Sequence, residues 1–118
     1  MSTVMVVDDS RFQRMMLSKV IKEQGHEVLE AADGGEAVSM YGASKPDLAL
    51  MDVTMPNKDG LQALEEIRGL DPTARVVMLT ALDQDSVVVK AIELGARDFL
   101  AKPVPPERLV SMLQKMLG

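Results

Sequence analysis

The residues of this sequence that could carry out chemistry are few, and they follow four short apolar runs. They are Asp8 and Asp9, then Asp52, Thr80 and Lys102. A carboxylate at the end of a buried segment is costly unless a nearby group requires it. Each residue alone has a plain structural explanation, such as a helix cap or a turn. Their joint placement at the ends of separate runs predicts one shared pocket.

Carboxylates gathered in one pocket repel each other. Two such charges about 4 Å apart cost about 4 kcal/mol at an effective dielectric near 20. Either one of them is protonated or a cation is present. Mg²⁺ fits the second possibility, because it prefers oxygen ligands and is commonly held by one or two carboxylates, water and a phosphate. We expect Asp9 and Asp52 to be direct or near-direct ligands and Asp8 to act through water.

The other groups of this pocket suit a phosphoryl group. Lys102 supplies a compact positive charge for a phosphoryl oxygen, and the hydroxyl of Thr80 can donate to another. Asp52 would then be the nucleophile and would become an aspartyl phosphate. Catalysis by the domain would consist mostly of positioning and charge neutralisation.

Composition excludes several other functions. The chain has 118 residues and a formal net charge of −5, which disfavours direct binding of nucleic acid. The absence of cysteine excludes disulfides and thiol catalysis. The single histidine, His26, follows Gly25 in an expected loop and is interpreted as a solvated residue without a role. No signal peptide or membrane-spanning run is visible, so we expect a cytoplasmic protein with no membrane contact.

Strand-like runs alternate with helix-like stretches five times. The expected strands cover residues 3–7, 27–32, 48–52, 75–79 and 98–101, the second at a sheet edge. The expected helices begin at Ser10, after Gly35, after Gly60, at about Asp83 (ending at Gly95) and at Pro105–Glu107. This alternation predicts an α/β fold, a doubly wound five-stranded parallel sheet with helices on both faces. Right-handed crossovers place all strand carboxyl ends along one edge, where such sheets bind ligands.

Apolar periodicity predicts how two of the helices are turned. Phe12, Met15, Met16 and Val20 lie on one helical stripe, which is typical of a face packed against a sheet. In the fourth helix, residues 87–89 are three successive valines. They cannot all be buried, because successive helical residues diverge by about 100°. We expect at least one of them to face outward beside Lys90.

Taken together, these residues resemble those of a known family, the receiver domains of two-component response regulators. The length of the chain is similar to that of the stand-alone chemotaxis-type members. The resemblance covers the whole chain. The motifs that carry it are Asp8-Asp9, Asp52 with Met55-Pro56 and Gly60, Thr80-Ala81, and Lys102-Pro103. It implies the flavodoxin-like strand order 2-1-3-4-5. We expect residues 1–118 to form a single receiver domain, and the native-looking Met1 and complete last helix argue against excision from a longer regulator.

The resemblance also implies a function. A histidine kinase would donate a phosphoryl group to Asp52, with Mg²⁺ held by Asp8, Asp9, Asp52 and the backbone carbonyl of Thr54. The Lys102–Pro103 bond would be cis. Such a protein is a phosphoacceptor in signalling, not an enzyme, although it assists its own phosphorylation and slow dephosphorylation.

A conformational switch is implied as well. Thr80 would move toward the phosphoryl group and Phe99 would turn inward, a population shift that changes the surface of the fourth helix, fifth strand and fifth helix. Val88, Lys90 and Phe99 would belong to this partner face. Its target would be a downstream protein such as a flagellar motor component or another signalling protein, and the unphosphorylated chain would be a monomer. Thr54 and Leu82 would tune the lifetime of the phosphoryl group.

Two alternative functions are weaker. A phosphatase that works through a phosphoaspartate usually carries its nucleophile after the first strand in an Asp-x-Asp arrangement, whereas Asp52 follows the third run. A flavin- or nucleotide-binding module would need a Gly- or Thr-rich phosphate cradle after the first strand. The sequence has the acidic pair Asp8-Asp9 there instead.

Overall fold

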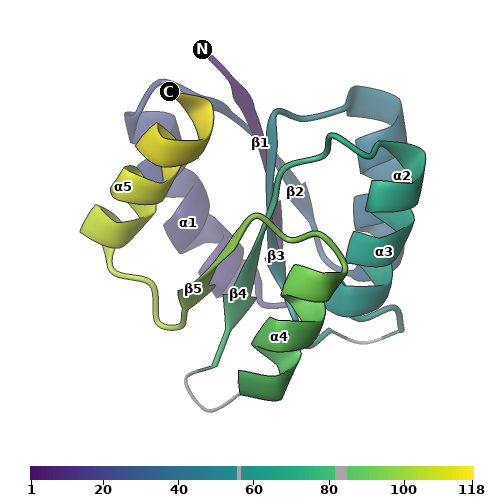
Figure 1. Cartoon of the computed structure of the whole chain (residues 1–118). Helices are drawn as coiled ribbons and strands as arrows, with labels where there is room; N and C mark the ends of the chain where they lie inside the picture. The colour runs from purple at the N-terminus through teal and green to yellow at the C-terminus, as the bar shows by residue number, and fades with distance from the viewer. Residues whose placement is uncertain (56, 82–84) are drawn as a thin grey trace.

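A five-stranded parallel sheet lies between two layers of helices in the computed structural model, which describes residues 1–55, 57–81 and 85–118 (Figure 1). In chain order the elements are β1 (Thr3–Val7), α1 (Arg11–Glu23), β2 (Glu27–Ala31), α2 (Gly34–Ser44), β3 (Leu48–Asp52), α3 (Gly60–Leu70), β4 (Val76–Thr80), α4 (Asp85–Glu93), β5 (Asp98–Ala101) and α5 (Pro106–Leu117). The strand order is β2-β1-β3-β4-β5. The predicted fold class and strand order are therefore confirmed. The expected start of α4 at Asp83 lies outside the described residues.

Burial explains why the central strands read as continuous apolar runs. Every residue of β3 and of β4 is buried, because helices cover both faces of the sheet. In β2, by contrast, Glu27 and Glu30 are exposed, Val28 and Leu29 are half-buried and only Ala31 is buried, in keeping with its place at the sheet edge.

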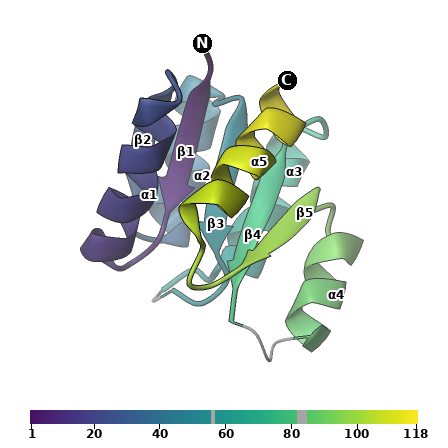
Figure 2. The same cartoon turned by 90° about the vertical axis from the view of Figure 1, so that its left-hand side faces the viewer.

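The helices divide between the two faces of the sheet (Figure 2). Met5 and Val7 of β1 point to the face covered by α2, α3 and α4. Val4 and Val6 point to the opposite face, where α1 and α5 pack. This alternation along one strand gives the protein two apolar layers of core.

Within the described ranges, no helix is long and apolar enough to cross a membrane.

The predicted inner face of α1 is wrong. Phe12, Met15 and Met16 are 65%, 56% and 53% exposed, and only the half-buried Val20 of that stripe packs against the core. The helix instead buries Leu17, Ser18 and Ile21. Phe12 and Met16 instead border a groove beside Val104 and Leu109, so they lie toward α5 and not under the sheet.

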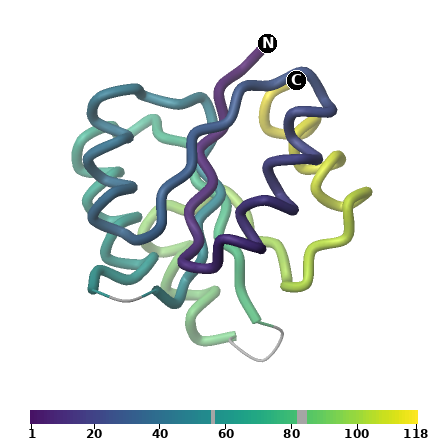
Figure 3. Tube along the Cα trace, turned by 180° about the vertical axis from the view of Figure 1, so that it is seen from behind, coloured from purple at the N-terminus to yellow at the C-terminus, as the bar shows by residue number. Residues whose placement is uncertain are grey.

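The two ends of the chain lie at the same end of the molecule (Figure 3). The backbone N–H of Ser2 donates to Nδ1 of His26 over 3.2 Å, and the N–H of Thr3 donates to Oδ2 of Asp47 over 2.8 Å. His26 is half-buried. The interpretation of His26 as a purely solvated residue was therefore wrong, since its ring anchors the start of β1.

The orientation of α1 gives a stability prediction. Ile21→Ala is expected to lower the free energy of unfolding by about 2–5 kcal/mol, because it removes buried surface and leaves a cavity. Met15→Ala on the same helix is expected to change it by less than about 0.5 kcal/mol. Urea unfolding followed by far-UV circular dichroism measures both, since the chain has no tryptophan. A loss in Met15→Ala as large as that in Ile21→Ala would contradict this orientation of α1.

Candidate functional site

The carboxyl ends of the strands bring the predicted polar residues together. Val7 pairs with Met51 in the β1–β3 register, so Asp8 lies level with Asp52 across these two strands. Thr80 pairs with Ala101 at the other side, which places Lys102 one residue beyond the end of β5. Asp8, Asp52 and Thr80 are 1%, 7% and 3% exposed. The parallel register thus assembles the site that the four apolar runs predicted.

Lys102 connects two of the carboxylates. Its Nζ lies 2.9 Å from Oδ2 of Asp8 and 3.0 Å from Oδ2 of Asp52. The backbone N–H of Lys102 donates to the carbonyl of Thr80 over 2.7 Å, and the Lys102–Pro103 peptide bond is cis. The lysine therefore enters the site from a backbone that is itself fixed to β4.

The three aspartates form an oxygen cluster. One carboxylate oxygen from each of Asp8, Asp9 and Asp52 lies within 4.8 Å of the others. Asp8 and Asp52 are buried, whereas Asp9 is exposed. At this separation each pair of ionised carboxylates repels by roughly 3–4 kcal/mol at an effective dielectric near 20, and one ammonium offsets only part of that. An all-oxygen set of donors with surplus negative charge fits a hard divalent cation such as Mg²⁺.

The pKa shifts show that Lys102 does not fully compensate the cluster. Burial raises the pKa of Asp52 above its ordinary value, and the negative charge of Asp8 adds to that rise. The hydrogen bond and the charge of Lys102 act in the opposite direction. For Lys102, burial acts to lower the pKa, but its hydrogen bonds to Asp8 and Asp52 outweigh burial and raise it. Lys102 therefore favours its charged form, while the pKa of Asp52 stays above its ordinary value in spite of the lysine.

Backbone contacts fix the two buried aspartates. The N–H of Ser10 donates to Oδ1 of Asp8 over 2.9 Å, so both oxygens of Asp8 have a donor inside the protein. Gly60, the first residue of α3, packs directly against Asp52: a Cβ at this glycine would lie 2.1 Å from the carbonyl oxygen of Asp52. The N–H of Gly60 donates to the carbonyl of Val53 over 2.8 Å. Only glycine permits α3 to begin so close to the end of β3.

The remaining predicted residues differ in their distance from the carboxylates. Thr54 is exposed just beyond Asp52, and its backbone N–H donates to the Asp52 carboxylate. Phe99 is 40% exposed on β5. Leu82, named for tuning the phosphoryl lifetime, lies outside the described residues, as does Pro56 of the family motif. Among the three valines of α4, Val89 is the exposed one at 57%, whereas Val88 is half-buried. Val89 is therefore the valine that faces outward beside Lys90, and the assignment of Val88, Lys90 and Phe99 to a partner face stays a prediction.

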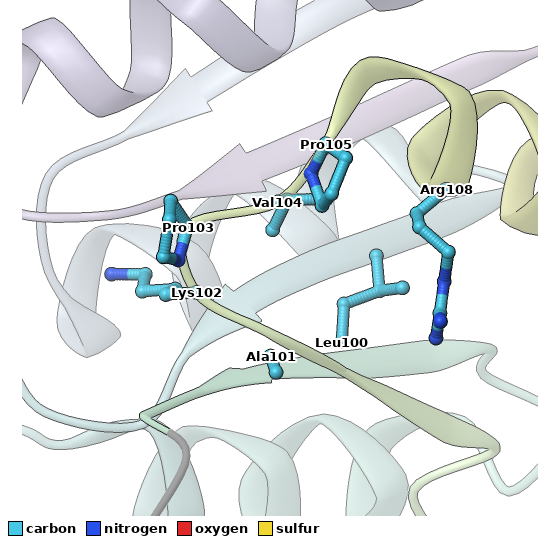
Figure 4. A pocket seen from close by; sticks show the side chains of 7 residues that line it. All are labelled: Leu100, Ala101, Lys102, Pro103, Val104, Pro105 and Arg108. Carbon is cyan, nitrogen blue, oxygen red and sulfur yellow. The ribbon is translucent and has the colours of Figure 1, made fainter.

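A hollow of about 240 Å³ lies beside the segment that carries Lys102 (Figure 4). It is lined by Leu100, Ala101, Lys102, Pro103, Val104, Pro105 and Arg108. Figure 4 shows the amine of Lys102 pointing away from Arg108 and Val104. The ammonium of Lys102 therefore contacts Asp8 and Asp52 and does not point into this hollow. The candidate site is the cluster of carboxylates.

One residue of the site was not found from the sequence. Nη1 of Arg14 donates to the carbonyl oxygen of Asp8 over 2.6 Å, and its Nε lies 3.1 Å from Oε1 of Glu30. An arginine in the first turns of a helix is usually solvated, so its residue type gave no signal. Arg14 lies four residues before the buried Ser18 and so on the same face of α1. That position indicates a buried role for Arg14 only when the orientation of the helix is known.

Comparison with known proteins decides the family. The model of the response regulator receiver domain matches residues 4–114. The chain belongs to the response regulator receiver family. A curated relative is chemotaxis protein CheY of Thermotoga maritima, 45% identical over 96% of this chain and 95% of the relative. Protein CcdB of Bacillus subtilis is 41% identical over 100% of this chain and 99% of that protein.

A solved structure gives the same answer. The CheX–CheY–BeF3–Mg complex from Borrelia burgdorferi contains a chain that superposes with a TM-score of 0.93 at 32% identity, covering 99% of this chain and 90% of that one. This receiver domain is accordingly a phosphorelay signalling domain and not a conventional enzyme. Its cluster of Asp8, Asp9 and Asp52 is consistent with a magnesium-binding phosphoacceptor pocket.

The raised pKa of Asp52 gives a pH prediction for the metal-free protein. The folded state keeps the proton of Asp52 at pH values where the unfolded chain, with a pKa of about 3.9, has lost it. Stability from this group is therefore complete below about pH 4 and falls as the pH rises through the raised pKa. Asp52→Asn removes that loss, so its gain in unfolding free energy over wild type should grow as the pH rises above about 4.

Urea unfolding with a chelator present measures this gain. Asp33→Asn is the matched control, because it removes the same charge from an N-cap position where asparagine serves equally well. We expect no comparable growth with pH in the control. A gain for Asp52→Asn that stays constant with pH would contradict the assignment.

Proposed function

We propose that Asp52 accepts a phosphoryl group from the phosphohistidine of a histidine kinase. The single observation that carries the proposal is the position of Lys102, whose Nζ lies 3.0 Å from Oδ2 of Asp52 beside a cluster of three carboxylates. An oxygen of Asp52 forms the new bond to phosphorus as the bond from phosphorus to the histidine nitrogen breaks. Membership of the receiver family supports this chemistry over a phosphatase or a flavin-binding module.

Each neighbouring side chain has a part in that transfer. Lys102 would leave the carboxylates and bind a phosphoryl oxygen, since its ammonium is a compact charge on a flexible stem. Thr80, buried at the end of β4, would donate its hydroxyl to a second oxygen. Because such a transfer needs positioning and charge neutralisation more than covalent help, these two residues supply most of what the protein must contribute.

Mg²⁺ would be held by Asp9, Asp52 and the backbone carbonyl of Thr54, and it would neutralise charge that develops on the phosphoryl oxygens. Asp8 would contribute through water, and the N–H of Ser10 would continue to donate to its Oδ1 after Lys102 has moved to the phosphoryl group. The CheY complex from Borrelia burgdorferi was solved with BeF3 and Mg, and that likeness supports the choice of ion.

The signal would leave through α4, β5 and α5. Val89, Ile92 and Phe99 are 57%, 54% and 40% exposed and are the large apolar side chains that these elements expose within the described residues. Phosphorylation would draw Thr80 inward, and Phe99 would follow by packing alone, because it has no hydroxyl to donate. Thr54 and Leu82 would set how long the phosphoryl group persists. A downstream signalling protein, such as a motor component in a chemotaxis pathway, would bind the changed surface.

Residues 1–118 would act as one stand-alone receiver in the cytoplasm. The protein would be monomeric before phosphorylation, and a histidine kinase would be its phosphoryl donor. The net charge of −5 makes a protein target more suitable than nucleic acid.

Phosphorylation itself is tested by intact mass. Wild-type protein incubated with acetyl phosphate and Mg²⁺ should gain the mass of one phosphoryl group, labile to acid and to base, and Asp52→Asn should gain none. Lys102→Ala should be phosphorylated at least about tenfold more slowly, since it removes a charge that contacts the transferring group. Asp33→Asn should behave as wild type. Failure of wild type to gain mass with donor and metal present would contradict the proposal.

The switch is tested by amide hydrogen exchange without any partner. Phosphorylation should change the exchange rates of amides in α4 and β5 while leaving those of α2 unchanged. Thr80→Ala should still be phosphorylated but lose this response, and Thr80→Ser, which keeps the hydroxyl, should retain it. An unchanged α4–β5 surface in phosphorylated wild type would contradict the proposed output face.

A further inference from the structure

The first turns of α1 have an unusual distribution of polar and apolar side chains. Arg14 and Ser18 lie on the side that faces the sheet, whereas Phe12, Met15 and Met16 face outward. The side chain of Arg14 is only 15% exposed. A charged side chain is seldom placed at a helix–sheet junction unless hydrogen bonds replace its water. Arg14 therefore needs a specific explanation.

Its contacts lie at the edge of the acidic cluster. Nη1 of Arg14 donates to the carbonyl oxygen of Asp8 over 2.6 Å. The N–H of Asp8 donates to the carbonyl of Ala31 over 3.1 Å, so both backbone polar groups of Asp8 are fixed. Nε of Arg14 contacts Oε1 of Glu30 on β2 over 3.1 Å. The guanidinium thus connects α1, the end of β1 and β2 at the point where the chain turns into the acidic pair.

We propose that Arg14 is a positioning residue for the cation site, and that Glu30 holds it in place. This inference rests on the proposed magnesium-dependent function. By fixing the carbonyl of Asp8, Arg14 sets the direction in which the chain leaves β1 and hence where the carboxylates of Asp8 and Asp9 face Asp52. The planar guanidinium presents several donors in fixed geometry, so it can hold a carbonyl and a carboxylate together.

The charge of Arg14 allows a test by the direction in which Mg²⁺ affinity changes when Arg14 is replaced. A cation near the metal site repels Mg²⁺, so removing its charge should tighten metal binding if electrostatics were its only effect. If Arg14 positions the ligands, removing it should weaken metal binding instead, because the loss of an outer-shell partner typically costs about 10- to 100-fold in metal affinity. The two explanations predict opposite directions for the same variant.

Arg11 offers a matched control. It occupies the same helix, carries the same charge and is exposed. Arg11→Gln and Arg14→Gln each remove one positive charge, but only Arg14→Gln removes a contact to Asp8. Isothermal titration calorimetry with Mg²⁺ alone then compares the two variants with wild type, and no phosphoryl donor is needed.

We expect Arg14→Gln to raise the dissociation constant for Mg²⁺ about tenfold and Arg11→Gln to leave it unchanged or slightly lower. Arg14→Lys should lie between, since it keeps the charge and one donor. In the metal-free protein, the amides of Asp9 and Ser10 should exchange faster in Arg14→Gln than in wild type, while amides of α5 keep their protection. Glu30→Ala should produce a smaller change of the same kind in these two amides.

Each outcome decides the proposal. Unchanged or tighter Mg²⁺ binding by Arg14→Gln overturns it, and so does equal weakening by Arg14→Gln and Arg11→Gln. If Arg14→Gln fails to fold, Arg14→Lys takes its place, and wild-type affinity in that variant overturns the proposal. Wild-type protein that binds no Mg²⁺ would instead overturn the proposed function, so the two failures can be told apart.

Discussion

Mutual repulsion among Asp8, Asp9 and Asp52 is the constraint on which the structure of the site depends. Three carboxylates share a space of less than 5 Å, and two of them are buried. Lys102 supplies one ammonium to two of them, which leaves the cluster with surplus negative charge. The cluster is therefore ready for a divalent cation, and the position of Lys102 suits a phosphoryl group that arrives with it.

The fold maintains this unfavourable arrangement through its core. β3 and β4 are buried along their whole length, and parallel pairing in register fixes the ends of the strands side by side. The apolar layers on both faces supply the stability that offsets the cost of the charged edge. Gly60 contributes by allowing α3 to begin directly against the backbone of Asp52. The buried interior of the sheet thus supplies stability, and the carboxyl ends of its strands carry the functional side chains.

The fold and the acidic cluster could be predicted because they depend on patterns along the chain. Alternating runs fix the parallel sheet, and a parallel sheet places strand ends along one edge. The orientation of α1 could not be predicted, because an apolar stripe does not say what it faces. Phe12 and Met16 border an exposed groove beside α5 and leave the sheet to Leu17 and Ile21. Which valine of α4 is exposed, and the contact of Arg14 with Asp8, depend on helix rotation in the same way.

The most direct measurement of the central claim is the thermal unfolding midpoint of the unphosphorylated protein as Mg²⁺ is added. A ligand that binds only the folded state raises stability in proportion to the logarithm of its concentration once it exceeds its dissociation constant. The midpoint of wild type should therefore rise steadily with millimolar Mg²⁺, and that of Asp9→Asn should rise far less. A wild-type midpoint that does not respond to Mg²⁺, or one that rises equally in Asp9→Asn, would contradict the account.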